Sequence, residues 1–395
     1  MIDDTLRLVV GGREWSGWQE IAVALSMDTL PANFSIQVTE KYPLTGDMPF
    51  NPGDPCQVKI GNDLVITGYL DRYGASVSPA EHTVRIEGRS KSEDLVDCSA
   101  FMGSPDAPSF QVLGGTAVGI IQSLARPYGV TINSIAGQGR EIPQFNINFG
   151  ETAWEIIDRL TRYSQLIAYD MPDGSIQLAQ AGGGKMASGF KQGVNIEAAH
   201  ITYSMDQRYA EYEAHILAST AFSDQAGLAA TKAGGVVTDG GVPRFRRRYI
   251  LSEQSQLGTF IAHDRAVWEC NRRKGRSQAV NLVADSWRDA AGALWALNHQ
   301  APVDLPALKL SAPDWLIGSV TFLRGQNGQH AELTLMPKEA FLPEPVGNLG
   351  LVLLSDIDKN NPTKPDNPPY DPHSPTGAAG IKGLPGSPSG PSSAR

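Results

Sequence analysis

The residues with the most obvious chemical promise form a glycine-rich stretch that resembles a phosphate-binding loop. GGGKMASG at 182–189 has the glycines and the lysine of that loop, but Ala179 stands where its first glycine is required. Met186 stands where a Ser or Thr hydroxyl would bind the metal ion. We therefore interpret the segment as a flexible linker and expect no nucleotide cofactor.

A second stretch, DIDKNNPTKPDN, begins like a calcium-binding loop. Asp356, Asp358 and Asn360 offer oxygen atoms at alternate positions, as calcium loops do. The loop's obligatory glycine is replaced by Asn361, and its bidentate glutamate by Asn367. We interpret the stretch as solvated tail and expect no metal site in the chain.

Histidine, serine and cysteine patterns also lack catalytic spacing. The histidines form no H-x-x-x-H or H-E-x-x-H pair, and no G-x-S-x-G motif occurs. Cys56, Cys98 and Cys270 form no C-x-x-C pair, so we expect reduced, mostly buried thiols of a protein made in the cytoplasm.

Neighbouring carboxylates are the remaining candidates for acid–base chemistry. Glu155 with Asp158, and Glu211 with Glu213, would serve a glycosidase only if the fold set their separation. We interpret these pairs as solvated side chains. The sequence thus predicts no catalytic, cofactor-binding or metal-binding residues, and no enzyme.

Arginines form two clusters that suit a binding surface. The first alternates with aromatic residues and comprises Arg244, Phe245, Arg246, Arg247, Arg248 and Tyr249. The second, RRKGR at 272–276, ends a predicted helix, where the helix dipole favours cations. Because the whole chain has a net charge of −9, the first cluster favours a protein partner over nucleic acid, although its pattern leaves both open.

The clearest local structure lies at 146–182. Thr152 and Glu155 have the spacing of a capping box at the start of a helix. Apolar residues then recur every three or four positions, and the pattern changes to period two at LIAYD before the turn MPDGS. We predict a capped helix and a hairpin that act as a structural spacer.

The length of 395 residues predicts several domains, and 41% apolar residues suffice for their cores. Strand-like alternation broken by Gly and Pro predicts a β-barrel domain at 1–100, and mixed patterns predict an α/β module at 101–189. Proline and glycine dominate 346–395, which predicts a disordered tail. The acidic N-terminus does not resemble a signal peptide, and no apolar run is long enough to predict a membrane span.

Four segments of the first domain recur in the same order towards the C-terminal end. The matched segments are 26–28 with 204–206, 52–60 with 302–310, 64–70 with 315–322, and 82–88 with 330–336. These matches predict a duplicated β-domain, so that the fold is α+β, mainly β, with two similar β-barrels flanking the α/β module. The first match also aligns Phe34 with Tyr212 and Ile36 with Ala214.

The second β-barrel is expected to be split. Its parts are 190–218 and 300–345, and an insertion at 219–299 with a helix and a strand separates them. An insertion at a loop position costs little loop entropy, and such segments often contact partners.

Two charges recur at matched positions of the duplicated domains. Asp54 matches Asp304, and Lys59 matches Lys309. We predict that these four residues lie at the interface between subunits of an oligomer, where charges of opposite sign would pair.

A resemblance to a known family enters through HTVRIEGRSKSEDLVDCS at 82–99. This motif, and the pattern from WALNHQAPVDLPALKLSAPDWLIGSVTF to LTLMPKEAF, resemble the Mu tail protein P family of baseplate hub proteins from contractile-tailed phages. The wider group includes the hub of T-even phages and the base of the spike protein VgrG. The resemblance covers about residues 1–345 and leaves the tail outside it.

The resemblance implies a structural role. Hub proteins of this family are homotrimers in which two β-barrels per chain form a pseudo-sixfold ring between the tail tube and the central spike. Expected partners are therefore the spike, the tail tube and other baseplate proteins, with DNA only passing through the channel. The expected location is the virion baseplate, after assembly in the host bacterial cytoplasm. An acidic channel would repel the passing DNA.

Two other functions remain as alternatives. A receptor- or carbohydrate-binding module of a tail tip would expose clustered aromatic residues on loops, and a cell-wall hydrolase would need paired carboxylates in a cleft. The residues Trp154, Trp268, Trp287 and Trp295 lie within helix or strand patterns, which predicts core positions and favours the hub.

Overall fold

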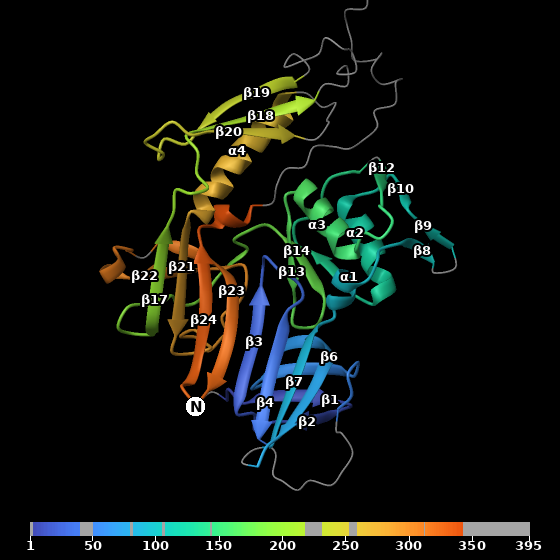
Figure 1. Ribbon diagram of the computed structural model, residues 1–395, viewed down its shortest axis with the longest axis vertical. Coiled ribbons are helices and arrows are strands. Elements are labelled where there is room, and N and C mark those ends of the chain that lie inside the picture. The colour runs from blue at the N-terminus through green and yellow to red at the C-terminus, as the bar shows by residue number, and fades with distance from the viewer. Residues whose placement is uncertain are drawn as a thin grey trace, which may run out of the picture. The chain divides into compact units, whose positions relative to one another are not determined.

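The computed structural model describes residues 3–39, 50–79, 82–104, 107–142, 144–217, 231–252, 259–311 and 313–342. The fold is mainly β, and one sheet of fourteen strands contains strands from both ends of the described chain. Figure 1 shows this sheet with the helical elements of the middle of the chain beside it. The predicted tail at 346–395 and the calcium-loop-like stretch lie outside the described residues.

The first β-unit is formed by the N-terminal strands. They are β1 (Leu6–Val10), β2 (Arg13–Trp15), β3 (Glu20–Ser26), β4 (Asn33–Thr39), β5 (Pro55–Ile60), β6 (Asp63–Val77) and β7 (His82–Ser90). Buried and partly exposed residues alternate along β1, where Leu6 and Leu8 enter the core, because successive side chains of a strand point to opposite faces. The strand order from β3 is β3-β4-β7-β6-β5.

The second β-unit has the same order of neighbours. Its strands are β17 (Ile196–Tyr203), β21 (Gln278–Ala284), β22 (His299–Asp304), β23 (Asp314–Gly325) and β24 (Gly328–Met336), in the order β17-β21-β24-β23-β22. The short strands β15 (Gly184–Lys185) and β16 (Phe190–Lys191) also pair with β22. The duplication is therefore visible in the topology of the sheet.

Strand pairing gives the register of the duplication. Ile21 pairs with Ile36 in the first unit and Ala199 pairs with Leu282 in the second, so β3 corresponds to β17 and β4 to β21. This register aligns the Ser-Met-Asp triplet at 26–28 with that at 204–206, as the sequence match predicts.

The two Ser-Met-Asp triplets also adopt the same turn. The amide of Asp28 donates to Ser26 Oγ over 3.1 Å, and the amide of Asp206 donates to Ser204 Oγ over 3.1 Å. Such local side-chain to backbone bonds favour a turn at the end of a strand.

The structure differs from the sequence match at β4. Phe34 and Ile36 correspond to residues of β21, whereas Tyr212 and Ala214 belong to a separate sheet in the insertion. The strand β21, which we expected within the insertion, pairs with β17 and β24 in the main sheet. Tyr212 and Ala214 misled the match because they alternate with polar residues as β4 does.

The match of 82–88 with 330–336, which aligns His82 with His330, is shifted by one residue in the structure. Bulges interrupt the pairing of β6 with β7 at Asp71, and of β23 with β24 at Gly318. When the two units are aligned at these bulges, His330 corresponds to Thr83 of the first unit and not to His82. A one-residue slip reverses the face of every side chain, so sequence similarity alone does not fix the register.

The middle module contains three helices and several short strands. They are α1 (Glu93–Asp97), β8 (Met102–Ser104), β9 (Ala107–Ser109), β10 (Gln111–Leu113), α2 (Ala117–Ala125), β11 (Ile132–Ser134), β12 (Gln144–Asn146), α3 (Ala153–Tyr163), β13 (Ile167–Asp170) and β14 (Ile176–Ala179). The predicted capping box is present, with Thr152 Oγ1 accepting from the Glu155 amide at 3.2 Å and Glu155 Oε2 from the Thr152 amide at 2.8 Å. The predicted apolar stripe of α3 is buried in the core of this module.

The glycine-rich segment at 182–189 is paired to the second β-unit. Gly184 and Lys185 lie parallel to β22, and Lys185 Nζ is 2.8 Å from a carboxylate oxygen of Asp314. Met186 is buried. The interpretation as a flexible linker is corrected accordingly, because main-chain pairing and burial both hold the segment.

The insertion begins before the predicted residue 219, because β18 belongs to it and not to the second β-unit, and it forms a small unit with its own core. The strands β18 (Glu211–Leu217), β19 (Thr231–Thr238) and β20 (Arg247–Ser252) make a three-stranded sheet against α4 (Thr259–Arg276). Tyr212 and Ala214 of the sheet pack with Ala262, Ala266 and Cys270 of the helix. No described helix is both long and apolar enough to span a membrane.

Candidate functional site: the junction between the β-units

The two β-units meet along β3 and β23. These strands pair antiparallel over six residue pairs, from Ser26 with Ser319 to Ile21 with Arg324. Val23 and Phe322 lie opposite each other in the middle of the junction and are both 0% exposed. Both β-units contribute to one hydrophobic core, so the junction is part of the interior of the protein.

A buried arginine bridges the two units beside this junction. Arg288 Nε donates to Asp4 Oδ1 and Nη1 to Asp63 Oδ2, both over 2.6 Å. The same guanidinium donates to the carbonyl oxygens of Ile60 (3.2 Å) and Gly292 (2.9 Å). Because the planar guanidinium satisfies four oxygen atoms from both units, it fixes their relative placement.

Asp170 joins the first β-unit to the middle module. Its Oδ2 accepts from the amide of Ala32 at 2.7 Å, Ser90 Oγ at 2.6 Å and Ser92 Oγ at 3.0 Å. Burial raises the pKa of this carboxyl, although these three hydrogen bonds act in the opposite direction. The contacts explain both serines of the motif RSKS at 89–92.

Arg89 of the same motif holds a cluster of carboxylates. Its guanidinium lies 2.5 Å from Asp71, 3.1 Å from Glu93 and 2.8 Å from Asp97. Burial raises the pKa of Glu93 to about 8, and the charge of Asp71 adds to this effect. The motif therefore positions α1 on the first β-unit.

Of the four predicted interface residues, Asp54 and Lys59 lie in the first β-unit and Asp304 and Lys309 in the second. Asp54 Oδ2 accepts from the amide of Asn51 at 2.8 Å, and Asp304 lies at the end of β22. Lys59 lies in β5, with its Nζ 3.6 Å from a carboxylate oxygen of Glu14.

The matched lysines occupy different backbone settings. Lys59 belongs to a strand, whereas Lys309 is exposed and follows a 3₁₀ turn at Pro306–Leu308 with a left-handed φ of 59°. The pairing of the four charges across a subunit interface stays a prediction.

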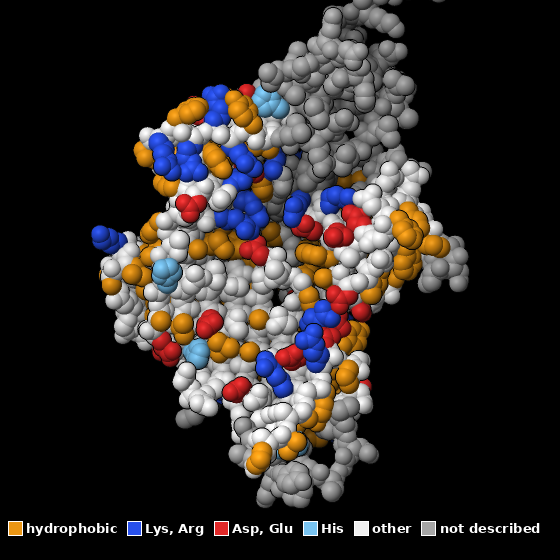
Figure 2. Space-filling view, viewed as in Figure 1, with side chains coloured by type: hydrophobic (Ala, Val, Ile, Leu, Met, Phe, Trp, Pro, Cys, Tyr) orange, Lys and Arg blue, Asp and Glu red, His pale blue; other side chains and the backbone are white. Residues whose placement is uncertain are grey.

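The arginine-rich surface lies on the insertion and on α4. Figure 2 shows lysine and arginine side chains gathered there. Three guanidiniums surround the ring of Tyr209, with Arg246 at 5.1 Å, Arg273 at 5.5 Å and Arg248 at 5.7 Å from its centroid. Phe245 is 78% exposed beside them, so this surface combines cations with exposed aromatic area.

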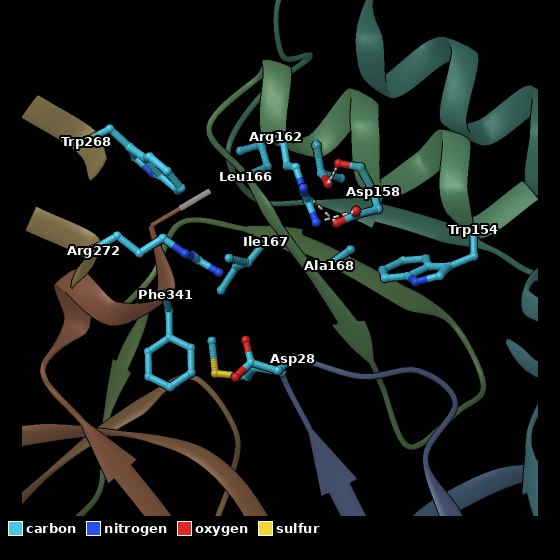
Figure 3. Close-up of a pocket in the computed structure, with 12 residues that line it drawn as sticks. Asp28, Trp154, Asp158, Arg162, Leu166, Ile167, Ala168, Trp268, Arg272 and Phe341 are labelled. Atoms are coloured by element: carbon cyan, nitrogen blue, oxygen red, sulfur yellow. Dashed lines mark hydrogen bonds and ion pairs between the residues drawn. The ribbon is translucent and has the colours of Figure 1, made fainter. Parts of the chain in front are cut away.

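A small cavity of about 160 Å³ lies between α3, α4 and the Ser-Met-Asp turn of the first unit. In Figure 3, Trp268 and Arg272 reach it from α4, and Asp158 and Arg162 form an ion pair beside it on α3. Trp154 and Trp268 are half-buried at the cavity, whereas Trp287 and Trp295 are buried in the core as predicted. Within the described ranges, no group of histidine, cysteine and acidic residues is arranged to hold a metal ion.

The cysteines follow the sequence prediction in part. Cys56 and Cys270 are buried and Cys98 is exposed, and all three are free thiols. Burial raises the pKa of Cys56 to about 12, with smaller contributions from Glu93 and Asp71. A thiol held in its protonated form is a poor nucleophile.

Comparison with known families matches three successive parts of the chain to domains of phage baseplate proteins. Residues 5–90 match the N-terminal domain of the Mu phage baseplate assembly protein GpP-like family, 92–180 match the second domain of the baseplate hub protein gp44-like family, and 258–344 match the fourth domain of GpP. The baseplate hub protein gp44 of Escherichia phage Mu is 26% identical over 348 residues, which cover 86% of this chain and 90% of gp44. The chain belongs to the Mu-like baseplate hub proteins.

Solved structures extend the likeness of this hub protein. The 43 kDa tail protein of prophage MuSo2 from Shewanella oneidensis is 25% identical, with a TM-score of 0.75 over 86% of this chain and 100% of that chain. A tail protein of Neisseria meningitidis MC58, 18% identical, has the same fold, with a TM-score of 0.73 over 87% and 99% of the two chains.

A more distant structure shares the fold. An Escherichia coli component of the type VI secretion system, described as similar to the T4 tail proteins gp27 and gp5, is 11% identical and has a TM-score of 0.54. The match covers 86% of this chain and 80% of that protein.

Proposed function

We propose that this hub protein forms a homotrimeric ring that joins the tail tube to the central spike of a contractile phage or phage-like tail. Its partners are then the spike, the tube and other baseplate proteins, and DNA passes transiently through the channel. The role is structural and not enzymatic, in the virion baseplate, after assembly in the host bacterial cytoplasm.

The observation that carries this proposal is the duplicated strand order within one sheet. One chain contains β3-β4-β7-β6-β5 and β17-β21-β24-β23-β22, joined through β3 and β23. Three such chains supply six comparable β-units, each part of a barrel-like domain, while the ring as a whole keeps threefold symmetry. An adaptor between a sixfold tube and a threefold spike needs that combination.

The mass of the purified protein in solution tests the proposal. Size-exclusion chromatography with light scattering should give three times the chain mass, and negative-stain images should show rings with a central opening. A monomer across the accessible concentration range would refute the trimeric hub. Binding of the isolated chain on a glycan array would instead support the receptor-binding alternative.

A further inference from the structure

The junction inside the chain provides a template for a junction between chains. On one edge of β23, β24 pairs with Leu316–Gly325. On the other edge, β22 pairs with the first residues of β23 up to Leu316, and β3 pairs with Ser319–Arg324. The edge of β23 is thus shared between a strand of its own unit and a strand of the other unit.

The corresponding strand β6 has the same edge half filled. On one edge, β7 pairs with Gly68–Val77, and on the other, β5 pairs with Asp63–Tyr69. Among the described residues, no strand pairs with Arg72–Val77 on the β5 edge. Aligned at the bulges, these residues correspond to Ser319–Arg324 of β23, which are the residues that β3 covers.

The strand β17 has the complementary open edge. It corresponds to β3, and in the described part of the chain it pairs along its length only with β21. β3 has β4 on one side and β23 on the other. Among the described residues, β17 therefore lacks the neighbour that β23 provides for β3, and Arg72–Val77 of β6 lack the neighbour that β3 provides for β23.

Exposure at the two open edges agrees with a missing neighbour. Val23 and Phe322 are 0% exposed at the internal junction. Ile201, the counterpart of Val23, is half-buried, and Ala75, the counterpart of Phe322, is exposed. The apolar side chains of Tyr203 and Val77 are 59% and 72% exposed. Apolar residues on an unpaired strand edge promote association with another strand.

We propose that β17 of one chain pairs antiparallel with Arg72–Val77 of a second copy of this chain, in the register of the internal junction. Tyr203 then lies opposite Tyr73, Ile201 opposite Ala75, and Ala199 opposite Val77. Thr202 opposite Gly74 and His200 opposite Ser76 occupy the other face. This inference rests on the proposed function and names the strands that close the ring.

The proposed register matches side chains by type. On one face it places apolar or aromatic residues opposite each other, and on the other face it places small or polar residues opposite each other. A slip by one residue would bring Ile201 opposite Gly74 or Ser76 and reverse the faces. Because the internal and external junctions use corresponding strands, repetition around three chains closes a ring and leaves neither edge free.

Cysteine cross-linking of the full-length chain tests the register. In a Cys98→Ser background, which removes the one exposed native thiol, one variant combines Tyr73→Cys with Tyr203→Cys and another combines Gly74→Cys with Thr202→Cys. Directly opposed strand residues have Cα atoms about 4.5–5.5 Å apart, which is within the range of a disulfide. Hydrogen-bonded and non-hydrogen-bonded pairs alternate along an antiparallel ladder, so the two variants test one pair of each type. A matched control combines Tyr73→Cys with Ile201→Cys, two positions out of register.

The expected result is oxidation of at least one in-register pair to covalent trimers, seen on non-reducing gels, with the control at least tenfold weaker. A trimer that cross-links in neither in-register pair, or equally in the control, refutes this register but leaves the trimeric hub standing. A monomer under all conditions refutes both.

A charge placed at the proposed contact provides a second test. Ala75→Glu should leave the melting temperature of the monomer unchanged but abolish the trimer, because the residue is exposed only in the free chain. Ala290→Glu is the matched control, since Ala290 is also exposed but lies after β21, outside both strands of the proposed pairing. This variant should keep the trimer. A trimer that survives Ala75→Glu as fully as Ala290→Glu would overturn the pairing at β6.

Discussion

Arg288 and Asp4 are bonded over 2.6 Å although 284 positions separate them in the chain. Asp4 also accepts from Gln329 Nε2 through Oδ2 at 2.9 Å, and its carbonyl accepts from Arg324 at 3.1 Å. The first residues of one β-unit are thus held by three side chains of the other. The angle between the units, which any ring of such chains depends on, is set by this contact and by the β3–β23 pairing.

Replacing Arg288 with Ala should lower the free energy of unfolding by about 2 kcal/mol, because Asp4 and two carbonyl oxygens lose a buried donor. Asp63, whose side chain is 54% exposed, can be hydrated instead. Urea denaturation of the purified protein measures this. Arg85→Ala is a matched control, since the Arg85 side chain is 58% exposed, lies 2.9 Å from Glu87 and is outside the proposed pairing between chains, and we expect a loss below about 1 kcal/mol. Equal losses in the two variants would contradict the bridging role of Arg288.

The features that could be predicted from the sequence are those that depend on residues close together in the chain. The capping box of Thr152 and Glu155, the apolar stripe of α3 and the Ser-Met-Asp turns all depend on residues a few positions apart. Arg288 has no local signal, because its partners come from the other end of the chain and become neighbours only when the sheet forms. The same applies to Asp170, whose donors lie in the first β-unit.

The strand matches failed for a different physical reason. Alternation identifies a strand but does not say which sheet it joins. Tyr212 and Ala214 of β18 were therefore aligned wrongly with Phe34 and Ile36. Register within a match is fixed by bulges such as those at Asp71 and Gly318, and a bulge leaves little trace in the residue types around it.

Gly68 should not tolerate a side chain. A Cβ atom at this position of β6 would lie 1.8 Å from the carbonyl oxygen of Arg89, which belongs to the paired strand and cannot move aside alone. Gly68→Ala should therefore cost about 1–3 kcal/mol of stability, typical of overpacking, measured by thermal or urea unfolding. Gly325→Ala, at the end of β23, is the control, since apart from its chain neighbours no atom would lie within 4 Å of the added Cβ. A Gly325 variant as unstable as the Gly68 variant would point to strand propensity instead.

Lys309→Glu tests the predicted charge pairing between subunits. Lys309 is exposed, so the substitution should leave folding unchanged, and if its ammonium group meets Asp54 or Asp304 of a neighbouring chain the trimer should shift towards monomer. Light scattering after size exclusion at low and high salt measures the shift, which added salt should reduce because exposed charges are screened. An unchanged trimer removes these four residues from the interface.

The stability of the hub protein should fall as the pH rises through the range in which Glu93 titrates. Its pKa is raised from 4.5 to about 8 by burial, with the charge of Asp71 adding to the effect and Arg89 opposing it. Between these two values the folded chain binds more protons than the unfolded chain, so the free energy of unfolding decreases with increasing pH. The stabilisation from the protonated carboxyl is complete below the unfolded pKa and is lost as the pH passes the folded pKa.

Glu93→Gln isolates this effect, because the amide keeps the shape of the protonated side chain and does not ionise. The melting temperature of the variant should equal that of the parent near pH 5 and exceed it increasingly towards pH 8. Glu87→Gln, on the adjoining strand β7 and more exposed, is the matched control for removing a carboxylate from an ion pair with arginine. If the two melting curves of the Glu93 variant and the parent stay parallel from pH 5 to pH 8, Glu93 ionises in the folded protein as it does in the unfolded chain, and the buried carboxylate cluster has no effect on its protonation.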